Sequence, residues 1–318
     1  RLAQPYDGEV AAADEVVGGL LEHLRALGLY DRALVIVTSD HGEGLGDHGE
    51  DQHSILLYRE ALQVPLLVKL PGGRFGGESV RGLAQLSDLL PTVTALLGLE
   101  TPAGLRGRSL LTLRGNVPAG RVAYGETLYP RLQLGWSDLL SAVDGRWHYI
   151  HGPRPELYDL AADPRETRDL AAAQPRELAR LRAEIEAVPS GPQAPQGVGP
   201  EEAERLAALG YVGTARARPA GAGLPNPREQ LPSLERLREA YRLAAARRPE
   251  RAADVLTQLT RERPSLVEAW VKLGDVQLEA GRAAEAVSSY EEALRRTPVL
   301  LPDVALALGL AQLRAGRL

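Results

Sequence analysis

A period of 34 residues near the C-terminus constrains the fold of this chain most strongly. In the unit that starts at Val267, positions 4, 7, 8, 20, 24, 27 and 32 hold Trp270, Leu273, Gly274, Ala286, Tyr290, Ala293 and Pro298. A weaker unit from Ser233 repeats positions 20 and 32, and Leu308-Gly309 opens a third unit after one extra residue. Such a period predicts pairs of helices that stack unit upon unit.

This spacing resembles the tetratricopeptide repeat. The resemblance implies an all-α segment over residues 233–318, with a protein or peptide partner, or self-association, as its role. Trp270 and Tyr290 are expected to be core aromatics of the repeat. Because terminal repeats normally cap a stack, an array that stops in mid-unit at Leu318 is expected to be truncated.

The first hundred residues alternate between helical and strand patterns. Apolar residues recur at helical spacing from Val10 to Leu27, and Gly28 follows as a stop signal. The β-branched runs Ala33–Val37 and Val64–Val68 are typical of parallel strands covered on both faces. The sequence therefore predicts an α/β fold for this part.

A different pattern begins near residue 121. Asp144-Gly145 separates the runs Ser141–Val143 and Trp147–Ile150, which predicts a β-hairpin with a type I′ turn. Leu157–Leu160 is expected to close a small antiparallel sheet, and a helix is expected over about 175–188.

These patterns divide the chain into four predicted parts. We expect an α/β core over residues 1–120, an antiparallel subdomain over 121–188, a Pro- and Gly-rich linker with a short helix near 201–209 over 189–232, and the repeats over 233–318.

Composition narrows the function classes. The net charge of −5 argues against a general nucleic-acid binder. With no cysteine, disulfides, thiolate metal sites and a cysteine nucleophile within these 318 residues are excluded. The longest apolar run free of charge, residues 89–99, is about half of the roughly 20 residues that a membrane span needs. The cellular location is not predicted.

One loop carries most of the chemistry. Residues 38–58 contain three of the six histidines and no Lys or Arg, together with five acids, Asp40, Glu43, Asp47, Glu50 and Asp51. Carboxylate and imidazole form a mixed oxygen and nitrogen site for a divalent metal, and Asp40 comes directly after a predicted buried strand. The alternative interpretation is that Asp40 forms an Asx turn in a solvated loop.

Neighbouring motifs are specific in order and spacing. They are Tyr6-Asp7-x-Glu9, Val35–Glu43, Gly46–Gly49, His53, Leu57-Tyr58-x-Glu60, Val64–Gly72 and the later Glu156–Glu166. Together they resemble the C-terminal half of a sulfatase, a family of the alkaline-phosphatase superfamily. The resemblance covers about residues 6–213 and implies the distal half of an α/β sandwich of that type.

The resemblance implies hydrolysis of a sulfate ester at a metal site, most typically a calcium site. It makes Asp40 and His41 the late pair of metal ligands, and His53 a catalytic residue that contacts the sulfate or protonates the leaving group. Asp47 and His48 are further candidates. Asp14, Tyr58 and Glu60 are expected to be structural, and His23, His148 and His151 receive no role.

The family's nucleophile is a formylglycine made from Cys or Ser in a C/S-x-P-x-R motif. No Ser of this chain has Pro and Arg at that spacing, and the early metal-binding aspartates have no counterpart. We therefore expect the chain to be a fragment that is inactive alone, with the formylglycine in a missing N-terminal part. The alternatives are a phosphonate monoesterase or phosphoglycerol-transferase-like relative, or a non-catalytic domain tethered to repeats that bind a protein.

Overall fold

A computed structural model describes residues 3–113, 120–188, 223–296 and 302–316 of the chain. The chain divides into two compact units. The first unit comprises residues 1–126, 139–151 and 155–187, and the second comprises residues 127–138, 152–154 and 188–318. The boundaries of the four predicted parts stay a prediction.

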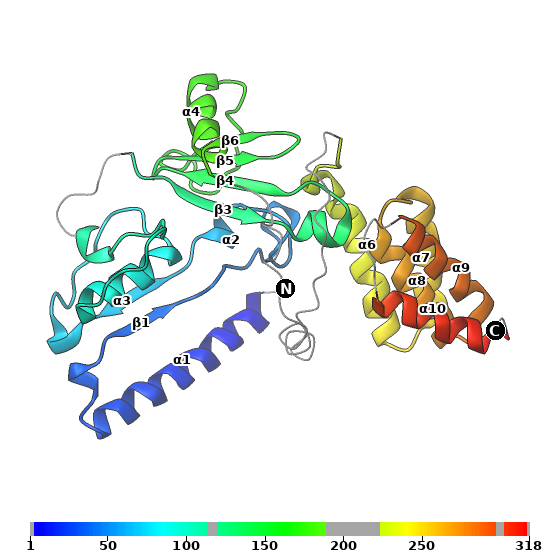
Figure 1. The fold of residues 1–318 in the computed structure, drawn as a ribbon, viewed down its shortest axis with the longest axis horizontal. Helices are drawn as coiled ribbons and strands as arrows, with labels where there is room; N and C mark the ends of the chain where they lie inside the picture. Colours follow the sequence, from blue (N-terminus) through cyan, green and yellow to red (C-terminus); the bar gives the residue numbers. More distant parts are fainter. Residues whose placement is uncertain (1–2, 114–119, 189–222, 297–301, 317–318) are drawn as a thin grey trace. The chain divides into compact units, whose positions relative to one another are not determined.

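The first unit begins with the long helix α1 (Ala3–Ala26) and a two-stranded sheet (Figure 1). Strand β1 (Val35–Thr38) pairs with β2 (Leu66–Lys69), with Val35 opposite Lys69 and Thr38 opposite Leu66. The two strands were expected to be parallel and covered on both faces, but they pair antiparallel and Leu67 is 61% exposed.

The connection between the strands explains this difference. Parallel neighbours need a crossover, usually a helix, that carries the chain back along the sheet before the next strand begins. The segment between β1 and β2 instead contains only a 3₁₀ turn (Asp47–Gly49) and the four-residue helix α2 (Arg59–Leu62), so the chain returns directly beside β1. The apolar runs predicted strands correctly, but not their direction.

The remaining short elements of this part include helix α3 (Leu89–Leu97), which ends at Gly98 in the left-handed conformation. Four 3₁₀ turns lie around it in the chain, Tyr30–Arg32, Pro71–Gly73, Leu86–Asp88 and Leu110–Leu113. Buried Asp88 accepts hydrogen bonds from the backbone N–H groups of Gln85 and Arg108, and it pairs with Arg121. This carboxylate joins three segments of the first unit.

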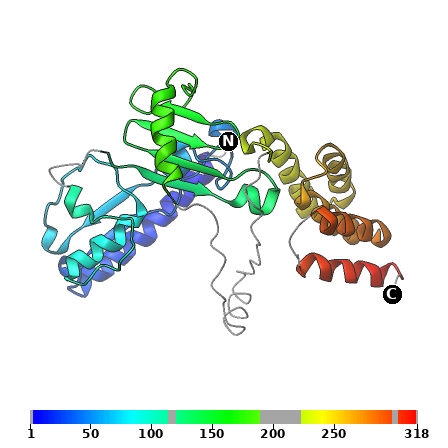
Figure 2. The ribbon, with the colours of Figure 1, turned by 45° about the horizontal axis from the view of Figure 1, so that its top comes forward.

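A four-stranded sheet follows, in the order β3 (Ala123–Thr127), β4 (Leu139–Val143), β5 (Trp147–His151) and β6 (Glu156–Asp159). The predicted hairpin is confirmed, because β4 pairs antiparallel with β5. The predicted type I′ turn is wrong: it needs a positive φ at both Asp144 and Gly145, but only Gly145 has one, at 93°, and Val143 pairs with His148 across a longer loop. Helix α4 (Pro175–Glu186) lies across one face of the sheet (Figures 1 and 2). The core between them consists of Leu140, Ala142, Trp147, Tyr149, Leu157, Leu181 and Ile185.

The second unit is mainly helical, with α6 (Pro227–Ala245), α7 (Pro249–Glu262), α8 (Val267–Glu279), α9 (Ala283–Arg296) and α10 (Pro302–Arg314). Helices α8 and α9 form the unit predicted from Val267, and α10 contains Leu308-Gly309, which was predicted to open the third unit. A short π-helical segment (Pro130–Leu134) contacts α8, and Leu134 and Trp136 are buried.

The end of the predicted linker is helical in the structure. Residues 227–232 belong to α6, where Asn226 accepts a hydrogen bond from the backbone N–H of Arg228 and Pro227 occupies the first turn. An Asn-Pro pair is a start signal for a helix, so the start of α6 could have been predicted from the sequence. The other linker residues up to 222, with the predicted short helix at 201–209, lie outside the described residues.

Within the described ranges, no helix combines the length and the apolar character that crossing a bilayer demands.

Candidate active site

The predicted metal-binding pair lies directly after β1. Asp40 Oδ1 accepts a hydrogen bond from the backbone N–H of His41 at 3.0 Å, and Oδ2 lies 3.6 Å from His41 Nε2. The side chain of Asp40 is 85% exposed. Hydrogen bonding by its own backbone N–H, followed by the effect of nearby His41, lowers the pKa of the Asp40 carboxyl. An ionised, accessible carboxylate therefore stands at the end of the strand.

His53 joins this pair although it lies twelve positions beyond His41 in sequence. The two imidazole rings stack with centroids 3.7 Å apart. His53 Nδ1 lies 3.2 Å from Glu43 Oε2, so a second carboxylate holds the ring. We name these four residues, Asp40, His41, Glu43 and His53, the Asp40 cluster. The predicted ligands Asp40 and His41 and the predicted catalytic residue His53 all belong to it, and Glu43 is added by the structure. The further candidates Asp47 and His48 lie elsewhere, beside α2.

Two glycines allow the loop to take this shape. The backbone N–H of Gly42 donates to Ala61 O at 2.8 Å, and a Cβ on Gly42 would lie 1.9 Å from Glu60 O. Gly44 donates to Gln52 O at 2.9 Å, and a Cβ there would lie 2.3 Å from Glu50 O. Only glycine permits such close approach of two backbones.

The far end of the loop is held by a buried carboxylate. Glu50 is 3% exposed and accepts the backbone N–H groups of Ile55 and Leu56 at 3.0 Å and 2.8 Å. Charge-assisted hydrogen bonds of this kind compensate the cost of burying the charge. Glu50 is thus a structural acid within the acid-rich loop rather than a ligand.

The donor types of the pair suit a divalent metal, since carboxylate oxygen and imidazole nitrogen are ordinary ligands. In the ranges that the structure describes, however, no three His, Cys, Asp or Glu side chains are grouped so that they could hold an ion. Asp40 and His41 therefore fit a metal as two of its ligands and not as a whole shell.

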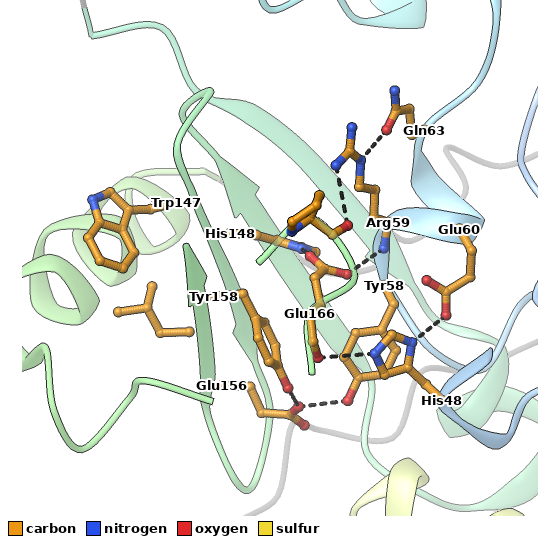
Figure 3. Close-up of polar contacts among 12 residues, drawn as sticks. His48, Tyr58, Arg59, Glu60, Gln63, Trp147, His148, Glu156, Tyr158 and Glu166 are labelled. Atoms are coloured by element: carbon orange, nitrogen blue, oxygen red, sulfur yellow. Dashed lines mark hydrogen bonds and ion pairs between the residues drawn. The ribbon is translucent and has the colours of Figure 1, made fainter. Parts of the chain in front are cut away.

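A second, more buried network ties the loop to the four-stranded sheet (Figure 3). His48 Nδ1 lies 2.6 Å from Glu60 Oε1, and His48 Nε2 lies 3.1 Å from the backbone oxygen of Glu166. Both partners are acceptors, so the arrangement favours a proton on each ring nitrogen, that is, the charged imidazolium. Burial lowers the pKa of His48, but the hydrogen bonds to Glu60 and Glu166 outweigh it and raise the pKa.

Glu166 is the centre of this network. Its carboxylate is 1% exposed, accepts the backbone N–H of Arg59 at 2.7 Å and pairs with His148. Glu156 likewise accepts the hydroxyl of Tyr58 at 2.6 Å (Figure 3). Glu156, Glu166 and His148 received no role from the sequence, although both acids lie inside the quoted motif Glu156–Glu166. Tyr58 and Glu60, which were expected to be structural, both take part in this network.

Comparison with known proteins shows what two parts of the chain resemble. Residues 1–99 match the sulfatase family model, and residues 237–300 match a tetratricopeptide repeat model. Residues 1–99 are therefore similar to sulfatases, as the sequence motifs suggested. The predicted repeats are confirmed by the second match and by the helix pair α8–α9.

Curated relatives extend the similarity beyond residue 99. A multifunctional alkaline phosphatase superfamily protein, PehA of Trinickia caryophylli, is 33% identical over 188 residues, which is 54% of this chain and 36% of that protein. Arylsulfatase K of Mus musculus is 28% identical over 199 residues, 59% of this chain and 36% of that protein. The chain thus spans little more than a third of these relatives.

A solved structure is similar in fold to this chain. BT4656, in complex with its substrate D-glucosamine-2-N,6-O-disulfate, superposes with a TM-score of 0.50 and 28% identity, covering 56% of this chain and 38% of that one. The predicted fold class, part of a sulfatase-type α/β fold with a small antiparallel sheet followed by helical repeats, is confirmed.

Proposed function

We propose that this chain contributes the late metal-binding and leaving-group part of the active site of a sulfuric ester hydrolase. The observation that carries the proposal is the stacking of His53 on His41 beside Asp40, because it gathers the three predicted residues on one exposed surface at the end of β1. The match of residues 1–99 to the sulfatase family supports the same activity.

Asp40 and His41 would hold a divalent cation, calcium by the family resemblance, and such a cation withdraws charge from sulfate oxygens. Asp40 suits this role because its carboxylate is ionised and open to solvent. No basic side chain lies in residues 38–58 to neutralise it. The remaining ligands would come from outside the Asp40 cluster.

His53 would protonate the leaving oxygen of the ester. Glu43 accepts from Nδ1–H of His53, which fixes the tautomer and leaves the exchangeable proton at Nε2. A proton delivered there stabilises the negative charge that develops on the leaving group. Glu43 would act through His53 and is therefore a positioning residue.

The formylglycine nucleophile would lie in a part of the protein outside these residues. The chain contains no Cys, and no Ser followed by Pro and Arg at the required spacing. We propose that this chain alone does not turn over sulfate esters, because losing one member of a catalytic unit forfeits most of the rate.

The test compares this chain with the same chain expressed together with the coding sequence upstream of it. We expect hydrolysis of an aryl sulfate only by the longer protein. In that protein Asp40→Ala should lower the content of bound metal. It should also lower turnover, because the transition state loses several kcal/mol of stabilisation. His53→Gln should lower turnover with the metal content unchanged.

Three outcomes would count against parts of this proposal. Full turnover and metal content in Asp40→Ala would remove Asp40 from the site. Equal turnover by both proteins would place the catalytic groups within these 318 residues. A preference for phosphonate monoesters over sulfate esters would favour the other branch of the alkaline-phosphatase superfamily.

The repeats point to a protein-binding role beside the hydrolase part. Stacked tetratricopeptide helices form extended surfaces that take protein or peptide partners. The match over residues 237–300 supports such an interaction and does not identify the partner.

A further inference from the structure

A hollow of about 400 Å³ lies in the first unit beside helix α2, apart from the Asp40 cluster. Its wall is formed by residues of the 47–65 segment and by Pro164 and Arg165. Two arginines, Arg59 and Arg165, line it, and nothing in the sulfatase chemistry above uses them.

Arg59 is held in place without a charged partner. Its backbone N–H is bound by buried Glu166, its Nη1 donates to the backbone oxygen of Pro164 at 3.2 Å, and its Nε donates to Gln63 Oε1. Over the described part of the chain, no carboxylate pairs with this guanidinium. A planar guanidinium that is fixed on neutral acceptors retains donors for an oxyanion.

The other charges around the hollow leave it positive. Glu60 lies 2.6 Å from the His48 imidazolium, so its charge is compensated. Asp47 is the remaining acid, and its Oδ1 is 3.8 Å from Arg165 Nη2 with both side chains largely exposed. A loose exposed pair of this kind contributes little and is readily exchanged. Arg59 and Arg165 together outweigh Asp47.

We propose that this hollow is a binding subsite for a sulfate or carboxylate group, held by the guanidinium groups of Arg59 and Arg165. Arginine presents its donors in a fork that matches the oxygens of such anions. As a subsite for a second anionic group of the substrate, the assignment rests on the proposed function. Its position fits, because α2 also receives the loop of the Asp40 cluster through Gly42 N–H and Ala61 O.

Asp47 has a defined effect in this subsite. Its carboxylate competes with the anion for Arg165 and repels it. Removing this charge should therefore strengthen anion binding, whereas a general loss of structure would weaken it. The direction of the change in anion affinity therefore distinguishes a real subsite from damage to the fold.

The experiment titrates this chain with inorganic sulfate, replacing chloride at constant ionic strength, and records ¹H–¹⁵N spectra including the arginine Nε–H signals. We expect saturable shifts at Arg59 and Arg165 with a dissociation constant of about 1 mM. Arg59→Gln should weaken binding about tenfold. Arg165→Gln should weaken it less, and Asp47→Asn should tighten it.

The matched control is Arg81→Gln, an exposed arginine of the same unit that does not line the hollow, and it should leave binding unchanged. Because binding is measured without turnover, failure of the hydrolase proposal would not alter this result. The subsite would be overturned if the sulfate-induced shifts persisted unchanged in both Arg59→Gln and Arg165→Gln. Weaker sulfate binding by Asp47→Asn would overturn it as well.

A second arm separates the two sources of the anion. Glucose 6-sulfate is titrated beside inorganic sulfate. Tighter binding of the sulfated sugar, lost in Arg59→Gln, assigns the subsite to a substrate group. If glucose 6-sulfate and inorganic sulfate bind equally well and both lose affinity in Arg59→Gln, the subsite is assigned to a free anion.

Discussion

At the scale of single residues, His48 links two distant parts of the first unit. It takes a positive φ of 51°, stacks on Tyr58 with ring centroids 3.7 Å apart, and donates to Glu60 and to the backbone of Glu166. The charged partners facing it are Glu60 on α2 and Glu166 beyond β6. The loop bearing Asp47 therefore depends on an imidazolium for its attachment.

This attachment should depend on pH. The folded-state pKa of His48 is raised above its ordinary value, so the stabilisation by the charged ring is fully present below about pH 6.5 and is lost as the pH rises through the folded pKa. His48→Gln should lower the free energy of unfolding by about 1–2 kcal/mol at about pH 5.5, and by less at about pH 8.5. Urea unfolding at both pH values measures the difference.

The matched control is His23→Gln, because His23 is an exposed histidine of α1. It should change stability little at either pH. An equal loss at both pH values in His48→Gln would mean that the ring acts by packing and not by its charge.

At the scale of elements, local signals predicted the hairpin well. Asp144 Oδ1 accepts the backbone N–H groups of Arg146 and Trp147 at 3.0 Å and 2.8 Å, and Gly145 supplies the positive φ. These interactions join neighbours in sequence, so the local sequence is enough to predict them. The pairing of β1 with β2 was predicted wrongly, because strand direction depends on the path of residues between the strands.

The repeats offer a matched pair of glycines at the same position of consecutive units. A Cβ on Gly274 would lie 2.6 Å from the ring of Tyr290, which is 1% exposed and donates to Asp275 Oδ1 at 2.8 Å. Gly309 has no atom within 4 Å of such a Cβ. The two positions therefore differ in packing and not in helix geometry.

Gly274→Ala should destabilise the second unit by about 1–3 kcal/mol, because the buried Tyr290 ring has to move. Gly309→Ala should be neutral or stabilise α10 by up to about 1 kcal/mol, since alanine favours a helix. Hydrogen exchange of residues 267–296 measures the first effect separately from the first unit. The same effect at both glycines would contradict the packing argument.

At the scale of the whole molecule, residues from the middle of the chain belong to the helical unit. Segments 127–138 and 152–154 group with it, Ser137 N–H donates to Pro225 O at 2.9 Å, and Leu134 and Trp136 are buried. The second unit is thus built from three stretches of the chain.

Limited proteolysis should cut first within residues 189–222, in the Pro- and Gly-rich stretches 189–200 or 214–222, which lack apolar periodicity. The two fragments should then stay together in gel filtration under native conditions, because residues 127–138 pack within the second unit while their chain continues into the first. A first cut inside α6–α9, or separation of the fragments after cleavage at 189–222, would contradict this arrangement.

The sequence by itself determined the repeat helices, the hairpin at Asp144-Gly145 and the acid-rich loop that follows β1. Each depends on spacing over a few residues or on a fixed period, and such patterns reflect local geometry. Only the tertiary structure brought Glu166 to Arg59 and His48, more than a hundred positions away, and placed Arg59 beside Arg165. No period links such positions, because their contact arises from the packing of whole elements.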